Sequence, residues 1–239
     1  MKEIVFTLVL VFVSLGCSIE MKAQGISDVP SNSFPFNLSG RSIMTYDNRY
    51  EGVKGTYTFL EEFMPGTVEL KKGKFTDVLI NYDAYTDNLL AKNDKINETV
   101  QMRKDMVINF VLKKASGVEY TFSKESINGV PTFLLNLVQD TISLYCRIRK
   151  TIVKADLGGA YNTSEKKFDE FVTENTFYVF NGSGDLREIQ KSKKGILQAF
   201  PEFNDQLSAY LKQNKIDFKS LDHMKLLIKY VNTLYKKNG

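Results

Sequence analysis

Apolar and polar residues alternate along much of the chain between residues 50 and 189, in short runs separated by turn sequences. The clearest run covers residues 106–113, which read MVINFVLK. Successive side chains of a β-strand point to opposite faces, so this pattern predicts strands with one buried and one wet face. Asn128 and Gly129 separate two later runs and favour a two-residue type I′ hairpin turn, in which both residues take positive φ.

Nine or ten such strands at this spacing predict an antiparallel sandwich or a barrel-like meander. We place two of them at 57–63 and 67–70, on either side of Pro65–Gly66, and two more at 168–172 and 177–180. The turn chemistry of Gly, Pro, Asn and Asp between the runs supports this division.

The apolar period changes from two to about 3.6 after Gln190, which predicts helices. Ser192 is placed to cap a helix that Pro201 terminates, residues 203–213 form a second, and Ser220 caps a third that runs to about Tyr235. The predicted fold class is therefore α+β, mainly antiparallel β, followed by about three C-terminal helices.

The N-terminus carries a basic start and an uncharged apolar run, Ile4–Gly16, which is typical of a secretory signal. The run is shorter than the roughly 20 residues that a membrane-spanning helix needs. We favour cleavage after Ala23. Lipidation of Cys17 is the alternative, although Ser14 stands where a lipoprotein signal has a large aliphatic residue, and an uncleaved anchor is the third reading.

These features divide the chain into a signal peptide (1–23), a flexible leader (24–46), an antiparallel β domain (47–189) and a C-terminal helical segment packed on that domain (190–239). The predicted location is periplasmic or associated with the outer membrane, with a lipoprotein as the alternative. Of the two cysteines, Cys17 is removed by cleavage at Ala23, so the fold must be held by its core rather than by a disulfide.

Charge is uneven along the chain. Residues 190–239 contain ten lysines and four acidic residues, a balance of +6 within a chain of net charge +4. Such a segment can meet an anionic membrane face or an acidic partner, but a solvated helical surface is the commoner reading. Nucleic acid is not expected for an exported chain whose lysines show no interleaved pattern of arginines or aromatic residues. The sequence makes no prediction of oligomeric state.

Few residues offer catalytic or metal chemistry. His223 is the only histidine, and no Ser-containing elbow motif accompanies it, so a boundary position on the last helix is the favoured reading. Cys146 shares the parity of an apolar strand face, whereas Arg147 and Arg149 have the opposite parity, so we expect a core thiol. One mature cysteine and one histidine are too few ligands for a zinc site. We predict no catalytic residue, no metal site and no cofactor.

Two further sets of residues, three aspartates and five aromatic residues, allow both a structural and a functional interpretation. Asp83, Asp87 and Asp94 lie in and after a loop between strands; their spacing does not match a calcium loop, and Asx-turn roles are favoured. Aromatic residues crowd the start of the β domain and either pack in strands or bind sugars or peptides: Tyr46, Tyr50, Tyr57, Phe59 and Phe63.

Four segments carry a resemblance to known proteins: 50–55 (YEGVKG), 63–68 (FMPGTV), 78–85 (VLINYDAY) and 198–203 (QAFPEF). They resemble a group of uncharacterised exported proteins of Bacteroidota that share the lysine-rich helical C-terminus. The resemblance implies an envelope location and a β-then-α layout, and it supplies no activity and no catalytic residue. Gln24 directly after the cleavage site is common in that group, which supports processing at Ala23.

Three function classes stay open. The favoured one is a non-enzymatic binding or assembly module of the cell envelope, whose partner is an envelope protein or a surface polymer. The second is a carrier of an apolar ligand in the cavity of a closed β-barrel. The third is a hydrolase that uses carboxylates alone, because such pairs come together only in three dimensions.

Overall fold

The computed structural model describes residues 50–93, 98–155 and 168–238. All of them belong to one of the two compact units of the chain, residues 32–239. The predicted signal peptide, both candidate processing sites and Asp94 lie outside the described residues, as does Tyr46.

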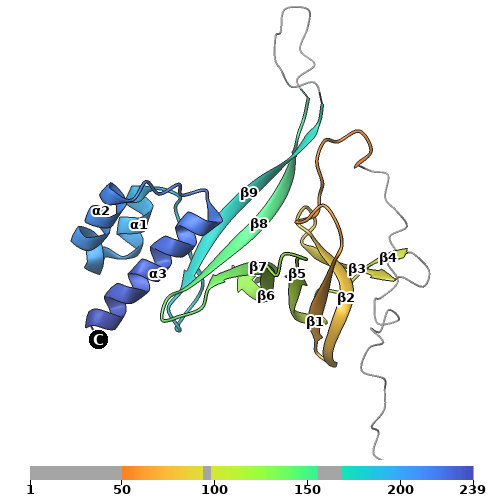
Figure 1. Ribbon diagram of the computed structural model, residues 1–239, viewed down its shortest axis with the longest axis horizontal. Helices are drawn as coiled ribbons and strands as arrows, with labels where there is room; N and C mark the ends of the chain where they lie inside the picture. The colour runs from red at the N-terminus through yellow and green to blue at the C-terminus, as the bar shows by residue number, and fades with distance from the viewer. Residues whose placement is uncertain (1–49, 94–97, 156–167, 239) are drawn as a thin grey trace, which may run out of the picture. The chain divides into compact units, whose positions relative to one another are not determined.

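Ten antiparallel strands form one sheet, in the order β10-β9-β8-β7-β6-β5-β1-β2-β3-β4 (Figure 1). Every neighbour in this order is also a neighbour in sequence, except that β1 lies between β2 and β5. The strands are β1 (Met64–Leu70), β2 (Gly73–Asp83), β3 (Asn88–Asn93), β4 (Glu98–Gln101), β5 (Val107–Lys113), β6 (Glu119–Ile127), β7 (Val130–Val138), β8 (Ser143–Val153), β9 (Glu170–Phe180) and β10 (Arg187–Ile189).

Three α-helices follow the sheet: α1 (Lys193–Ala199), α2 (Asn204–Gln213) and α3 (Leu221–Asn238), with a short 3-10 helix η3 (Pro201–Phe203) before α2. Ser192 caps α1 by accepting a hydrogen bond from the Gly195 N–H, and the hydroxyl of Ser220 accepts one from the His223 N–H at the start of α3. The predicted α+β class, with ten strands and three helices, is confirmed. Within the described ranges, no helix combines the length and apolar character needed to cross a bilayer.

The prediction of a strand at 57–63 is wrong. Those residues form bends, and side chains hydrogen-bond to their backbone groups. The amide of Asn81 accepts a hydrogen bond from the Leu60 N–H and donates to the carbonyls of Leu60 and Glu62. The hydroxyl of Thr58 donates to the same Leu60 carbonyl. These bonds occupy backbone groups that a strand would use for pairing.

Pro65–Gly66 does not form a turn either, since β1 runs straight through both residues. Pro65 lies at the start of β1, and pairing with β5 begins only at the next residue, Gly66. The missing N–H of a proline is tolerated at such a position. A Cβ at Gly66 would lie 2.3 Å from the carbonyl oxygen of Val111 and 2.6 Å from Cδ1 of Ile80. Gly66 therefore allows β1 to pack closely against its neighbours and does not reverse the direction of the chain.

The two strands predicted at 168–172 and 177–180 are a single strand, β9. Its polar middle, 173–176, pairs residue by residue with 147–150 of β8. From sequence, this polar stretch predicts a break between two strands. It remains extended because the backbone ladder with β8 continues through it. The short edge strand β4 was missed, since its ETVQ sequence carries little apolar signal.

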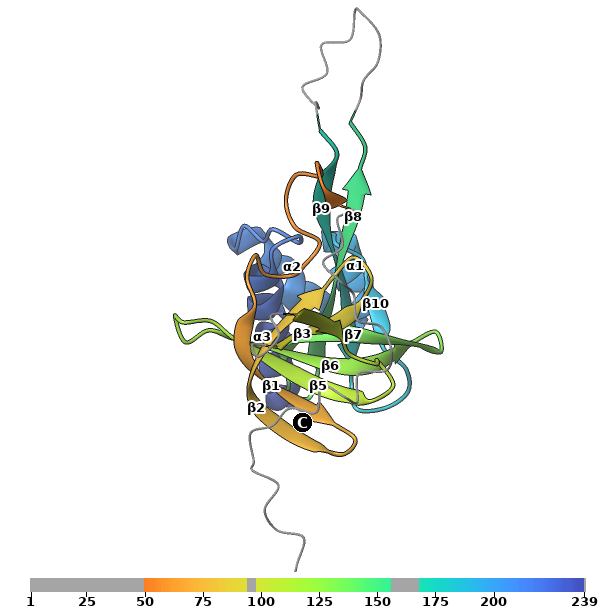
Figure 2. The ribbon, with the colours of Figure 1, turned by 90° about the vertical axis from the view of Figure 1, so that its right-hand side faces the viewer.

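Strands β7 and β8 diverge after a short stretch of pairing, and this fork shapes the rest of the molecule. Their ladder runs only from Leu135 and Cys146 to Val138 and Leu144. Beyond it, β7 continues with β6 alone, while β8 and β9 continue together to Val153 and Glu170. Figure 1 and Figure 2 both show β8 and β9 leaving the direction of β6 and β7. We call the pair 147–153 and 170–176 the arm.

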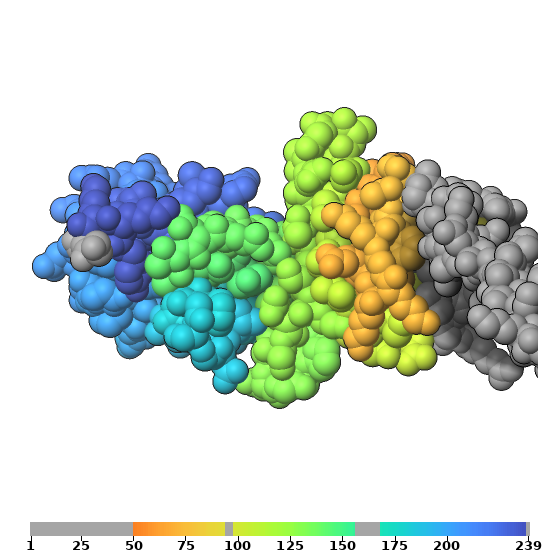
Figure 3. Space-filling model, turned by 90° about the horizontal axis from the view of Figure 1, so that it is seen from below, coloured from red at the N-terminus to blue at the C-terminus, as the bar shows by residue number. Residues whose placement is uncertain are grey.

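One apolar core serves strands and helices together. Four large rings fill the side formed by β2, β5, β6 and β7, with the centroids of Phe110 and Phe122 stacked 4.8 Å apart; the set is Tyr82, Phe110, Phe122 and Phe133. α3 packs on β7 and β8, and four of its apolar side chains are fully buried: Met224, Leu227, Ile228 and Val231. In Figure 3 the helices lie against β7 and β8, and β1 and β2 lie beside β5 and β6.

Candidate binding site at the fork between β7 and β8

The turn from β2 to β3, residues 84–87, lies in the fork and satisfies backbone groups that the diverging strands leave free. The Lys150 N–H of β8 donates to the Ala84 carbonyl at 2.9 Å. On the other side, the Phe133 N–H of β7 donates to Oδ1 of Asp87 at 3.2 Å. The turn therefore replaces part of the missing β7–β8 ladder, and buried backbone groups keep their partners.

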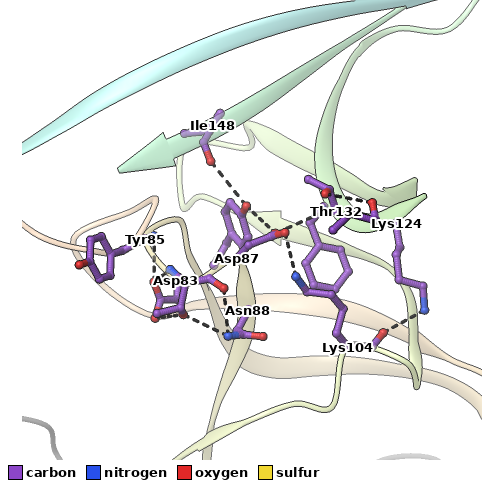
Figure 4. Close-up of polar contacts among 12 residues, drawn as sticks. Asp83, Tyr85, Asp87, Asn88, Lys104, Lys124, Thr132 and Ile148 are labelled. Carbon is purple, nitrogen blue, oxygen red and sulfur yellow. Dashed lines mark hydrogen bonds and ion pairs between the residues drawn. The ribbon is translucent and has the colours of Figure 1, made fainter. Parts of the chain in front are cut away.

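Asp83 shapes this turn from within. Its Oδ1 accepts hydrogen bonds from the N–H groups of Tyr85 and Thr86, and its Oδ2 accepts one from the Thr86 hydroxyl (Figure 4). These are the bonds of an Asx turn, so the predicted structural role of Asp83 is confirmed.

Asp87 has a different role from the one predicted, because it joins three separate elements rather than its own turn. Its Oδ1 accepts from the Tyr82 hydroxyl at 2.9 Å as well as from Phe133, and its Oδ2 accepts from Nζ of Lys104 at 2.8 Å. The side chains of Lys104 and Asp87 are only 26% and 19% exposed. Solvent screens such a pair less than it screens a surface ion pair.

Two further groups complete this polar cluster. Lys124 of β6 donates to the carbonyl of Lys104, as Figure 4 shows, and to the carbonyl of Asp105. Burial lowers the pKa of Lys124, and the nearby Lys71 lowers it further. Burial raises the pKa of Tyr82 well above its usual value, and the Asp87 carboxylate adds to the rise. Tyr82 is therefore a neutral hydrogen-bond donor that holds Asp87 in place.

A hollow of about 200 Å³ opens beside the turn, along the edge of β8 that β7 leaves unpaired. Its lining residues are Tyr82, Ala84, Tyr85, Thr86, Asp87, Arg147, Ile148 and Arg149. Arg147 is half-buried and Arg149 is exposed. Within the described ranges, neither arginine forms an ion pair with a carboxylate, although the register places Glu174 opposite Arg149.

Arg147 does have a polar neighbour. Burial raises the pKa of Tyr178, and a hydrogen bond and the positive charge from Arg147 oppose that rise. The same charge opposes the rise at Tyr82. The guanidinium of Arg147 therefore lies close to the hydroxyl of Tyr178, and a neutral tyrosine leaves its positive charge uncompensated.

An aromatic cluster adjoins the hollow. Tyr85 makes edge contacts with Tyr50 at 5.5 Å and Phe171 at 5.7 Å between ring centroids. Tyr50 also contacts Tyr57 and Phe171. The side chain of Tyr85 is 40% exposed, so the cluster presents part of an aromatic surface to solvent. Tyr50 and Tyr57, from the aromatic-rich start of the β domain, thus join the cluster beside the fork, whereas Phe59 packs on Tyr120 and Phe122 of the core.

His223 and Cys146, the other candidate residues from the sequence, do not line the hollow, and their contacts indicate structural roles. Nδ1 of His223 accepts a hydrogen bond from the Asp217 N–H in the loop before α3. Cys146 is fully buried, and burial raises its pKa to about 12, so the predicted core thiol is confirmed. Over the described residues, no three His, Cys, Asp or Glu side chains are grouped closely enough to hold a metal ion.

Arg147 and Arg149 were noted in the sequence only for their strand parity, and their site was missed. Two arginines two positions apart on a strand share one face, which is a usable signal. What the sequence does not show is that β7 leaves this edge of β8 and that the β2–β3 turn lies beside it instead. Comparisons with protein-family models, with curated proteins and with solved structures find no match for this chain.

Proposed function

We propose that the chain is an exported protein of the cell envelope that works as a non-enzymatic binding module, and that it binds a surface polymer at the fork. The observation that carries the proposal is the exposed aromatic and basic surface there: Tyr85 beside Arg147 and Arg149, neither of which is ion-paired within the described part of the chain. The signal-like N-terminus supports the location.

Apolar side chains on the arm extend this surface. Val153 and Val172 are each 37% exposed and share the face of Arg149, and Phe168 just before β9 is 63% exposed. Exposed apolar residues beside polar groups mark interaction surfaces when they cluster. Tyrosine and arginine suit such surfaces because each offers a flat face together with hydrogen-bond donors.

The proposal can be tested by co-sedimentation of the purified chain with insoluble cell-wall polymer from its host. We expect the chain to sediment with the polymer, and Tyr85→Ala to reduce the bound fraction several-fold. Val130→Ala is the matched control, because Val130 is 61% exposed but lies at the start of β7, outside the lining of the hollow. Equal binding by both variants, or no binding by the parent chain, would overturn the proposal.

Three measurements separate the other function classes. In the incubation with polymer, a hydrolase would release soluble fragments with new reducing ends or amines, and we expect none. A carrier would retain an apolar ligand, which native mass spectrometry of the purified chain would detect. Either of those results would replace the binding role, while crosslinking of Tyr85 to a protein alone would shift the partner from a polymer to an envelope protein.

A further inference from the structure

We propose that the hollow between the β2–β3 turn and β8 binds an oxyanion, a carboxylate or phosphate group carried by the polymer, through the guanidinium groups of Arg147 and Arg149. This inference rests on the proposed binding role, and it adds the chemistry of the group that is recognised.

The geometry of β8 supports two donors acting together. Residues 147 and 149 lie on one face of the strand, and side chains two positions apart are separated by about 7 Å along it. Both arginines line the hollow. Guanidinium groups present planar pairs of N–H donors that match carboxylate and phosphate oxygens, and such charge-assisted bonds are stronger than neutral ones.

The balance of charge in the hollow favours an anion. Asp87 is the one carboxylate among the lining residues, and Lys104 already pairs with it at 2.8 Å. Tyr82 and the Phe133 N–H also bond to that carboxylate, and among the described residues Asp87 forms no ion pair with either arginine. Glu174 lies across from Arg149 on β9 and is exposed, without an ion pair between them.

The neighbouring Tyr85 fits a ligand larger than the anion itself. Tyr85 is part-exposed, and it both lines the hollow and contacts Phe171 of the aromatic cluster. A sugar ring that stacks on Tyr85 would place an attached carboxylate or phosphate toward β8. The size of the hollow, about 200 Å³, suits one such group rather than a whole oligosaccharide.

The test is a titration of the purified chain with two probes, oligogalacturonate for the carboxylate and inorganic phosphate for the phosphate, followed by NMR shifts of the arginine side chains. We expect one probe to saturate, and Arg149→Gln to weaken it about tenfold or more. Arg149→Lys keeps the charge but not the paired donors, so we expect an intermediate affinity. Lys72→Gln, in the exposed β1–β2 turn, is the charge-matched control and should bind like the parent.

The outcomes are distinct. Saturation by oligogalacturonate alone identifies a carboxylate, and saturation by phosphate alone identifies a phosphate. The inference is overturned if neither probe binds, or if Arg149→Gln and Lys72→Gln weaken binding equally, since a diffuse charge effect would then be at work. If the chain still sediments with polymer in that case, the binding role stands without the oxyanion site. If sedimentation is absent too, both proposals fail.

Discussion

Asn232 of α3 shows how one side chain fastens a helix to the sheet. Its Oδ1 accepts from the Ile142 N–H at 2.7 Å, and its Nδ2 donates to the Ile142 carbonyl at 2.9 Å and to the Ile228 carbonyl. The side chain is buried, so both backbone groups of Ile142 depend on it. An amide is well suited to this position because it donates and accepts at once.

We expect Asn232→Leu to lower the free energy of unfolding by about 2–4 kcal/mol, because it leaves two buried backbone groups without partners. Urea unfolding followed by circular dichroism measures this loss. Thr233→Ala is the neighbouring control on the exposed side of α3, where we expect a change within about 0.5 kcal/mol. A loss for Asn232→Leu no greater than the control would contradict the assigned role.

Cys146 offers a prediction of chemical reactivity. Burial raises its pKa to about 12, so the thiol stays protonated in the folded chain at neutral pH and is sheltered from reagents. We expect no reaction with a disulfide reagent at pH 8 until the chain is unfolded, measured in a Cys17→Ser background. Rapid labelling of the folded chain would show that the thiol is accessible.

The same pKa sets the direction of a pH effect. The folded chain keeps a proton on Cys146 between the ordinary thiol pKa and about 12, whereas the unfolded chain releases it. The contribution of the thiol to stability is therefore complete below the unfolded pKa, and it is lost as the pH rises through that window.

Local residue roles follow well from sequence when the partners are close in the chain. Asn128 and Gly129 take φ values of 50° and 79°, as a type I′ turn requires, and Asp83 makes the expected Asx turn. Asp87 shows the limit of this reasoning. Its partner Phe133 lies 46 positions away, and only the folded sheet brings the two together.

At the scale of elements, the β2–β3 turn acts as a wedge between two strands that no longer pair. We expect Asp87→Asn to lower the free energy of unfolding by about 2 kcal/mol, since it removes the charge opposite Lys104 in a poorly solvated place. Hydrogen exchange should also quicken at the amides of Phe133 and Lys150, which face the wedge.

Asp185→Asn is the matched control for the wedge, because Asp185 lies in the exposed turn before β10. We expect it to leave both stability and exchange unchanged. If exchange at Phe133 and Lys150 rises no more in Asp87→Asn than in this control, the wedge does not hold the fork.

Strands were predicted well where one face is apolar. They were predicted poorly where contacts with distant side chains or a neighbouring strand determine the backbone conformation. The pattern over 106–113 placed β5 to within one residue. The stretch 57–63 looks like a strand, but Asn81 and Thr58 bind its backbone groups. The polar stretch 173–176 looks like a break, but its ladder with β8 keeps it extended. Both cases depend on segments that are distant in sequence.

At the scale of the whole described unit, strands and helices share one apolar core. Residues from β1 to β10 and from all three α-helices belong to it. We therefore expect a single unfolding transition, with far-ultraviolet circular dichroism and tyrosine fluorescence giving the same midpoint. An earlier loss of the helical signal would show that the segment after Gln190 unfolds separately.

The fold class could be predicted because alternation, turn residues and helix caps all indicate the same arrangement. The hollow could not, because it depends on where β7 and β8 part. Nothing in the sequences of β7 and β8 marks Leu135 and Cys146 as the last pair of their ladder. A site between a strand edge and a turn from elsewhere in the chain is a property of the assembled sheet.

The position of β1 between β2 and β5 has a consequence for the order of assembly. Every other pair of neighbouring strands is consecutive in the chain, so hairpins can form locally as β1–β4 and as β5–β10. The β1–β5 pairing alone must close a long loop, which makes it the slowest contact to search for. We infer that folding joins two preformed meanders along this seam, where Gly66 lets the strands approach closely.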